Sequence, residues 1–364
     1  MVITYIFPKR LEDQFRVQLR FRDFSDAINR LSIHRANLLD IDSFIQNTPD
    51  AQKTCAESDI LVIYRYLYGP ILSTIQYWKA REKKVIVEFD QAINYLSPEL
   101  FDYSFWIEGV PLTDGAEKKV ENRIDPAPLE QFKWGLGMVD AAIVPSARLA
   151  NDWLQYTNIY EIPDYINSSR YPTLEKPHTD QVWLGLGQDV QFASFKNSGL
   201  STAIESICRE CPQVSLILCG QEKLIGEGLN IDPSQIKTYS PNNFYEWVNL
   251  LLKLDIGLVP IYGDYDLRLS RATLLDFMIS KTPWIVTKQS PFASLSKYGS
   301  LVQNSVKAWK SEILKVMEQL EDFRREATRE PFLFALGQDI SVNIDKVLLV
   351  YSAILNQSPQ KDSK

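Results

Sequence analysis

The sequence predicts an α/β fold built from two parallel sheets, each covered by helices on both faces. Short apolar runs typical of strands alternate with helical patterns along most of the 364 residues. This alternation is typical of a parallel sheet with helices on both faces. It is interrupted at the polar, proline-containing segment 167–181 and restarts at Val182. The length also suits two domains with ample cores.

The first half supplies one complete set of strands and helices. The apolar run at 2–7 begins the set, and β-branched or aromatic residues dominate the later runs. Helical periodicity fills the intervals between them. The predicted strands are 2–7, 34–41, 59–67, 83–90, 140–146 and 158–164, and the predicted helices are 21–31, 42–57, 69–82, 128–138 and 147–156.

The second half repeats this organisation without repeating the sequence. We expect a first domain over 1–166, an interdomain linker over 167–181 and a second domain over 182–339. The linker is expected because its residues fit neither the strand nor the helix period. The predicted strands are 182–187, 214–220, 236–238, 255–261, 283–287 and 300–304, and the predicted helices are 197–211, 242–253, 269–280, 307–321 and the amphipathic segment 340–356.

Composition excludes several classes of protein. The formal net charge of −7 argues against a general nucleic-acid binder, which would usually present a basic face. No apolar run approaches the roughly 18 residues of a membrane span, and the first residues lack the layout of a signal peptide. We therefore expect a cytoplasmic protein, while peripheral contact with a membrane stays open.

The cysteines favour buried thiols over a redox or metal site. Cys208 and Cys211 form a C-x-x-C pair late in a helical pattern, whereas a reactive thiol is favoured at a helix N-terminus. No second C-x-x-C pair completes a zinc site. We expect no cofactor and no bound metal.

In open α/β sheets ligands bind beyond the carboxyl ends of the strands, so residues that follow strands are candidates. Gly185 and Gly187 end the first strand of the second half, where glycine lets a phosphate approach backbone N–H groups. A tight turn is the alternative explanation for both. The loop 262–271 follows a strand and carries Arg268, Ser270 and Arg271, and a guanidinium binds phosphate through a planar pair of hydrogen bonds.

Asp276 is the strongest single candidate. It interrupts an apolar helix, and a carboxylate among apolar neighbours needs hydrogen-bond partners. The vicinal hydroxyls of a ribose would supply them if the acid faced a cleft, whereas a structural salt bridge is the competing interpretation.

The order of these features resembles the donor-site signature of GT-B glycosyltransferases, especially retaining family 4. That signature has an acidic helix, a small turn with proline and a Val/Ile strand, and this chain has 276–279 followed by 283–286. The resemblance implies two Rossmann-like domains facing across a cleft, with the last helix crossing back to the first domain. It also implies transfer of a sugar from a nucleotide-sugar donor to a glycan, lipid or small-molecule acceptor, with retention.

The resemblance implies further site residues in both halves. In the donor domain, Lys196 stands in for a basic residue that holds the diphosphate, Gly220 follows a strand near the donor, and Tyr239 with Ser240 occupies the place of the nucleotide base. In the acceptor domain, Glu88 and Asp90 share one side of a strand end and take the catalytic positions that face the acceptor. Arg65 resembles an arginine that follows the third strand of the family.

The chain also departs from the family pattern. Arg268 and Asp276 replace paired acids, Thr273 replaces a lysine before the helix acid, and 8–17 replaces a Gly-Gly loop. The departures leave a second interpretation open, a GT-B-like binding or partner subunit with a degenerate donor site. An oxidoreductase with a dinucleotide-binding domain is weaker, because no G-x-G-x-x-G opens the first helix.

Overall fold

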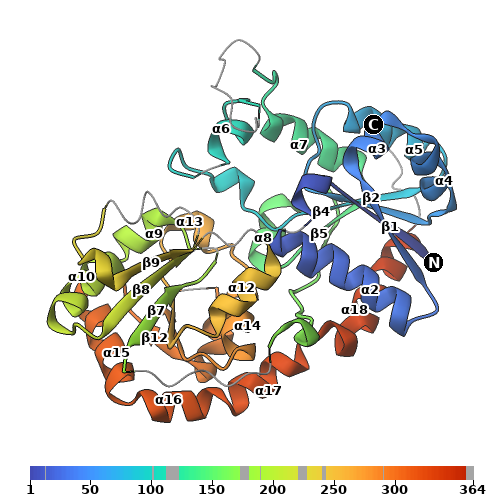
Figure 1. Cartoon of the computed structure of the whole chain (residues 1–364). Helices are drawn as coiled ribbons and strands as arrows, with labels where there is room; N and C mark the ends of the chain where they lie inside the picture. The colour runs from blue at the N-terminus through green and yellow to red at the C-terminus, as the bar shows by residue number, and fades with distance from the viewer. Residues whose placement is uncertain are drawn as a thin grey trace. The chain divides into compact units, whose positions relative to one another are not determined.

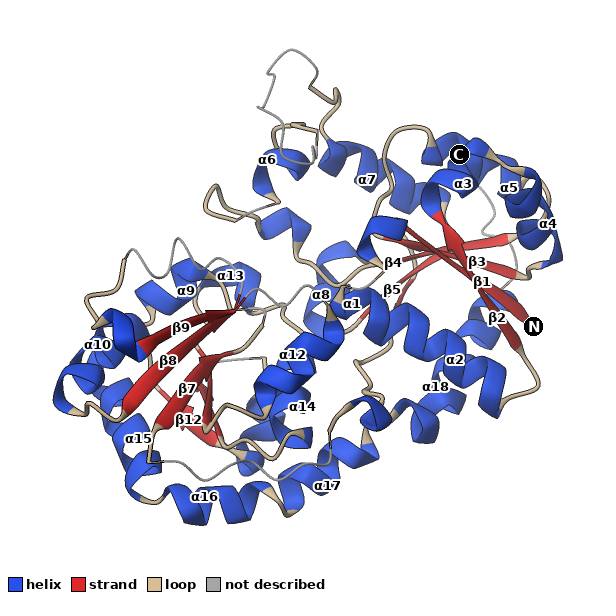
Figure 2. Cartoon of the chain, viewed as in Figure 1, coloured by secondary structure: helices blue, strands red, loops and turns tan. Residues whose placement is uncertain are grey.

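The computed structural model describes residues 1–357 apart from 13, 101, 112–122, 173–179, 189, 220–227, 240–242 and 290. The chain forms two compact units, one of Met1–Asp164 with Ile340–Lys364 and one of Tyr165–Asp339. Each unit holds a six-stranded parallel sheet with helices packed against it (Figure 1 and Figure 2). The predicted fold class is therefore confirmed.

The sheet of the first unit has the order β2-β1-β3-β4-β5-β6. The chain leaves β1 toward one side to form β2 and then crosses over to form β3, so the strand order reverses between β1 and β3. Ligands of doubly wound sheets bind at such a reversal. The strands are β1 Val2–Phe7, β2 Arg35–Asp40, β3 Ile60–Tyr64, β4 Lys84–Glu88, β5 Ala141–Val144 and β6 Ile159–Glu161.

The helices of the first unit follow the predicted pattern with one break. The predicted helix 42–57 is two helices, because Asn47 adopts a left-handed φ of 53° and Thr48 and Pro49 start a new helix. The short helices α1 and α6 were not predicted. The helices are α1 Phe15–Val17, α2 Asp23–Leu31, α3 Ile41–Gln46, α4 Pro49–Glu57, α5 Ile71–Lys79, α6 Tyr103–Trp106, α7 Pro128–Met138, α8 Ala147–Trp153 and α18 Ile340–Leu355.

The last helix belongs to the first unit, as the resemblance implied. Helix α18 packs beside α2 (Figure 1). The hydroxyl of Tyr351 lies 3.1 Å from the hydroxyl of Tyr5 on β1, and both side chains are fully buried. The amphipathic face of 340–356 therefore covers the sheet of the first unit.

The sheet of the second unit has the order β12-β11-β10-β7-β8-β9, with the reversal between β7 and β10. This is the Rossmann strand order. Its strands sit where the apolar runs predicted them. They are β7 Val182–Leu186, β8 Val214–Cys219, β9 Ile236–Tyr239, β10 Ile256–Val259, β11 Trp284–Thr287 and β12 Ser300–Val302.

The helices of the second unit differ from prediction at several places. The predicted helix 197–211 is α10, which begins later than predicted, at Leu200 after Gly199 with its φ of +85°. Helices α9, α13, α16 and α17 were not predicted. None of the described helices is long and apolar enough to cross a bilayer. The helices are α9 Phe192–Asn197, α10 Leu200–Glu210, α12 Phe244–Leu251, α13 Gly263–Asp266, α14 Ala272–Ile279, α15 Val306–Glu318, α16 Leu320–Ala327 and α17 Glu330–Gly337.

Candidate functional site

The strand reversal in the second unit brings the end of β7 against the first turn of α14. The N–H of Gly187 donates to the carbonyl of Leu258 on β10 at 3.0 Å. A Cβ built on Gly187 would lie only 2.3 Å from Cγ2 of Thr273 in α14, so glycine permits this approach. A helix N-terminus offers free backbone N–H groups and a positive dipole end. The end of β7 and the N-terminus of α14 thus lie in contact beside the strand reversal, and a helix N-terminus is a position at which anions can bind.

The loop that joins β10 to α14 is fixed by a buried acid. Asp266 is 1% exposed, accepts the N–H of Tyr262 at 3.0 Å and bonds the hydroxyl of Ser194. Beside it, Nη1 of Arg268 donates to the carboxylate of Asp264 at 3.0 Å. These bonds hold Arg268 close before the start of α14.

The other loop candidates also have defined positions. Ser270 is 3% exposed, and Nη2 of Arg271 donates to Oε1 of Gln338 at 2.7 Å. Arg268, Ser270 and Arg271 therefore lead directly into the helix whose first turn contacts Gly187. Both arginines already have protein partners, which any diphosphate would have to share or displace.

The structure places Asp276 differently from the prediction that this acid faces a cleft. Its side chain is fully buried. Oδ1 accepts the hydroxyl of Tyr171 at 2.5 Å, and Oδ2 accepts Nε1–H of Trp247 at 2.9 Å. Every residue of α14 is buried, so the helix has no solvent-facing side on which to present the acid. Tyr and Trp donors take the place expected for ribose hydroxyls.

The structure does not bring the remaining donor-side candidates together at the contact between β7 and α14. Gly185 lies inside β7 rather than after it, and a Cβ there would meet Cδ2 of Leu254 at 2.3 Å. Packing against Leu254 accounts for this glycine without a ligand. Lys196 is exposed on α9, and Gly220 and Ser240 lie outside the described residues.

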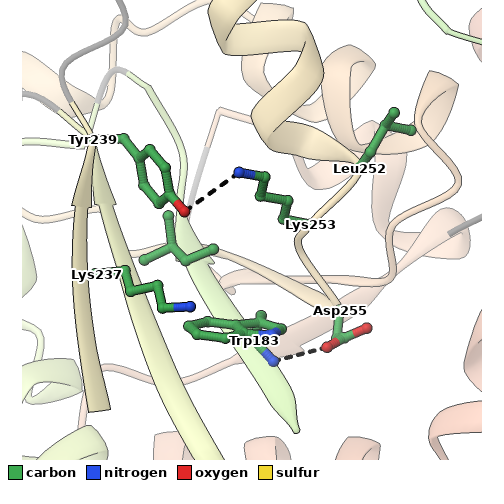
Figure 3. Close-up of a pocket in the computed structure, with 7 residues that line it drawn as sticks. Trp183, Lys237, Tyr239, Leu252, Lys253 and Asp255 are labelled. Carbon is green, nitrogen blue, oxygen red and sulfur yellow. Dashed lines mark hydrogen bonds between the residues drawn. The ribbon is translucent and has the colours of Figure 1, made fainter. Parts of the chain in front are cut away.

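Tyr239 lines a cavity of about 190 Å³ on one face of the sheet. Figure 3 shows Tyr239, Lys237 and Trp183 directed toward the same space. Nζ of Lys253 lies 3.4 Å from the Tyr239 hydroxyl, and Nζ of Lys237 lies 4.3 Å from the centre of a Trp183 ring. The contact between Tyr239 and a nucleotide base stays a prediction. The lining residues are Trp183, Ile217, Lys237, Tyr239, Leu252, Lys253 and Asp255.

In the first unit, Arg65 and Asp90 follow the paired ends of β3 and β4. Tyr64 is the register partner of Glu88, and the N–H of Arg65 donates to the carbonyl of Glu88 at 2.9 Å. Oδ2 of Asp90 forms an ion pair with Nε of Arg16 at 3.1 Å. The strand reversal between β1 and β3 therefore gathers predicted residues with an arginine from the segment that replaces the Gly-Gly loop.

Glu88 is placed differently from the prediction. It is 1% exposed and is bonded to Nε of Arg20, so its burial argues against the predicted contact with substrate. Arg20 also donates to Asp164 at 2.9 Å and to the carbonyl of Ile162 at 3.0 Å. This network joins the ends of β4 and β6 to the π-helical turn Gln18–Arg22.

Sequence reasoning missed Arg16, Arg20 and Asp164. Arg16 and Arg20 are four residues apart and share a helix face, and Asp164 closes the predicted strand 158–164, so their spacing did carry information. Burial raises the pKa of the Glu88 carboxyl, opposed by Arg20. Burial lowers the pKa of Arg20, but Glu88 and Asp164 outweigh it and leave the pKa raised.

Comparisons with known proteins agree with this topology. No family model matches the sequence, and no curated protein matches it. Sucrose-phosphate synthase from Thermosynechococcus elongatus is similar in structure, with a TM-score of 0.62, 11% identity and coverage of 98% of this chain and 100% of that one.

Two further solved structures are similar over nearly the whole chain. Anabaena Alr3699/HepE in complex with UDP and glucose has a TM-score of 0.58 and 11% identity, with coverage of 96% of this chain and 99% of that one. A putative UDP-N-acetylglucosamine 2-epimerase from Listeria monocytogenes has a TM-score of 0.57 and 12% identity, with coverage of 100% and 99%. At these identities the likeness shows the fold alone, and that fold is the one shared by GT-B glycosyltransferases.

Proposed function

We propose that the protein is a glycosyltransferase that takes a sugar from a nucleotide-sugar donor and passes it, with retention, to a glycan, lipid or small-molecule acceptor. The donor would bind the second unit and the acceptor the first. The single observation that carries the proposal is the contact of Gly187 with the first turn of α14 at the strand reversal of the second unit.

The chemistry of that position suits a departing diphosphate. The N-terminal turn of α14 and the guanidinium groups of Arg268 and Arg271 provide positive charge without a metal ion. In a transfer with an oxocarbenium-like transition state, stabilising the leaving group is the main electrostatic task. Thr273 stands where the family has a lysine, so these arginines are the cations that remain in the loop.

On the acceptor side, Asp90 is the acid that substrate can approach more readily than Glu88. It is 9% exposed against 1% for Glu88. Asp90 would accept a hydrogen bond from the acceptor hydroxyl, while Glu88 holds Arg20 in place. Arg65 would contact the acceptor beside Asp90.

A second candidate is a GT-B-like partner subunit that binds no donor. The observation that favours it is the burial of Asp276 behind Tyr171 and Trp247, which removes the best ribose ligand of the sequence pattern. The contacts of Arg268 and Arg271 with other protein groups also favour this candidate, because a diphosphate would have to share or displace those partners.

Calorimetry with UDP, GDP and ADP on the full chain separates the two candidates. The glycosyltransferase proposal expects at least one nucleotide to bind. Arg268→Met or Arg271→Met should weaken that binding about 10- to 100-fold, because a hydrogen bond to a charged group is worth about 1.5–3 kcal/mol. Arg329→Met removes an exposed guanidinium from the same unit and should bind like the parent. Absence of binding by all three nucleotides would favour the partner subunit.

A further inference from the structure

Arg65 is a buried cation held in a strained position. Its φ of 26° is left-handed, a conformation that costs about 1–3 kcal/mol for a residue other than glycine. Its guanidinium carbon lies 4.8 Å from the ring centre of Tyr64 and 5.4 Å from that of Tyr66. The side chain is thus fixed between two rings at the carboxyl end of β3.

One N–H of this guanidinium is a buried donor, the N–H of Nε. Arg65 is 8% exposed, and its buried Nε has no hydrogen-bond partner within the described part of the chain. Burial lowers the pKa of Arg65, but Tyr64, Tyr66 and Asp90 outweigh it and leave the pKa raised. The group is therefore charged. A buried polar group without a partner is rare enough to require an explanation.

Asp90 presents the complementary case on the neighbouring strand end. One oxygen is engaged by Arg16, whereas Oδ1 is buried and lacks a partner among the residues that the structure describes. Arg65 and Asp90 lie close enough for their charges to influence each other. A buried donor, Nε of Arg65, and a buried acceptor, Oδ1 of Asp90, both without a partner in the described part of the chain, therefore follow the paired ends of β3 and β4.

The chemistry of the pair selects among ligands. An anion would be attracted by Arg65 but repelled by Asp90. A cation would be attracted by Asp90 but repelled by Arg65. An alkyl group would leave both unsatisfied, at the cost of two buried polar groups. A hydroxyl accepts from a guanidinium and donates to a carboxylate, so it satisfies both.

Aromatic side chains extend from the same position. Tyr66 stacks on Trp106 with ring centres 6.2 Å apart and planes 6° apart. The partly exposed Tyr68 packs against Phe105 at 5.1 Å. Aromatic surface around a few well-placed polar groups is usual in small-molecule sites.

We propose that Arg65 and Asp90 bind a neutral carbohydrate through its hydroxyl groups, which makes the acceptor a saccharide rather than an apolar lipid or an anionic molecule. This inference rests on the proposed function in taking the first unit as the acceptor side. It narrows the acceptor to a class and gives Arg65 the role of a specificity-determining contact.

The test measures binding of free sugars to the full-length chain by saturation-transfer NMR. The neutral panel is glucose, fructose, galactose, mannose, N-acetylglucosamine, sucrose and maltose, and the charged comparison is glucose 6-phosphate and glucuronic acid. We expect a saturation-transfer signal from at least one neutral sugar and a weaker signal from the charged forms. A signal from none of the neutral sugars, or a stronger signal from the charged forms, would overturn the proposal.

Variants assign the binding to the pair. Arg65→Met should weaken it about 10- to 100-fold and Asp90→Asn about tenfold. The matched control is Arg81→Met, since Arg81 is exposed and lies 3.5 Å over the ring of Tyr77. If Arg65→Met lowers the melting temperature, Arg65→Lys replaces it, because lysine keeps the charge and loses the planar fork. Equal sugar binding by the Arg65 and Arg81 variants would refute the assignment.

Nucleotide binding by the same samples separates this inference from the proposed function. The Arg65 and Asp90 variants should bind the nucleoside diphosphate as the parent does. Sugar binding in a parent that binds no nucleotide would refute the glycosyltransferase and leave the saccharide site standing. Nucleotide binding without any sugar binding would refute the saccharide site and leave the glycosyltransferase proposal standing.

Discussion

Asp276→Asn tests whether the buried acid of α14 is structural. The carboxylate accepts from Tyr171 at 2.5 Å and from Trp247 at 2.9 Å. An asparagine keeps the shape but has one oxygen, so one of these two donors faces an NH2 group instead. A hydrogen bond to a charged group is worth about 1.5–3 kcal/mol, and the variant should lose about that much stability. In a unit of this size, that corresponds to a fall of about 3–12 °C in melting temperature.

Calorimetric melting of the full chain measures the effect. Asp322→Asn is the matched control, because Asp322 is 65% exposed and pairs with Arg325 within one turn; it should cost less than about 1 kcal/mol. Tyr171→Phe should also destabilise, and combined with Asp276→Asn it should show a coupling of about 0.5–3 kcal/mol. Nucleotide affinity, measured well below the melting temperature, should not change. An Asp276→Asn protein that melts like the control but binds nucleotide more weakly would restore the ribose interpretation.

Two further predictions concern the Arg20 ion-pair network and the buried cysteines. Arg20→Met leaves Glu88 and Asp164 without their shared cation and should destabilise the protein by about 3–5 kcal/mol. The control Arg329→Met should cost less than about 1 kcal/mol. Equal midpoints of urea unfolding for the two variants would contradict a stabilising role of the Arg20 network. Burial raises the pKa of Cys55 from 9.0 to about 12 and that of Cys208 to about 11, so at pH 8 their thiolate fractions fall about a thousandfold and a hundredfold. Alkylation mapped by mass spectrometry should therefore modify Cys211 before Cys208 and Cys55, and rapid labelling of Cys55 in the folded protein would refute this.

The positions of the strands were predictable because their cores are continuous apolar runs. Residues 2–7 and 60–64 are buried along nearly their whole length, and a buried parallel strand shows this pattern directly. Helix ends were less predictable. The break at Asn47 depends on a left-handed residue, and asparagine adopts this conformation in only some contexts.

The orientation of the site residues was not predictable from local pattern. Asp276 was expected in a cleft because its helix neighbours are apolar, yet the same apolarity reflects a helix buried on every side. Its partner Tyr171 lies 105 residues away in the chain, and no periodicity within the helix reveals such a contact. Arg65 and Asp90 were predicted from the family resemblance, and the structure places both just after strands, where ligands of open α/β sheets bind.

Turnover of nucleotide-sugars tests most directly the claim that this protein transfers a sugar from a nucleotide-sugar donor. The full-length chain is incubated with UDP-, GDP- and ADP-sugars together with the neutral saccharides that bind it, and products are followed by NMR. We predict that one nucleotide-sugar is consumed, that nucleoside diphosphate appears in step with a glycoside, and that the new bond keeps the anomeric configuration of the donor. Consumption of no nucleotide-sugar in the presence of a bound saccharide would contradict the claim, and inversion at the anomeric carbon would contradict its retaining form.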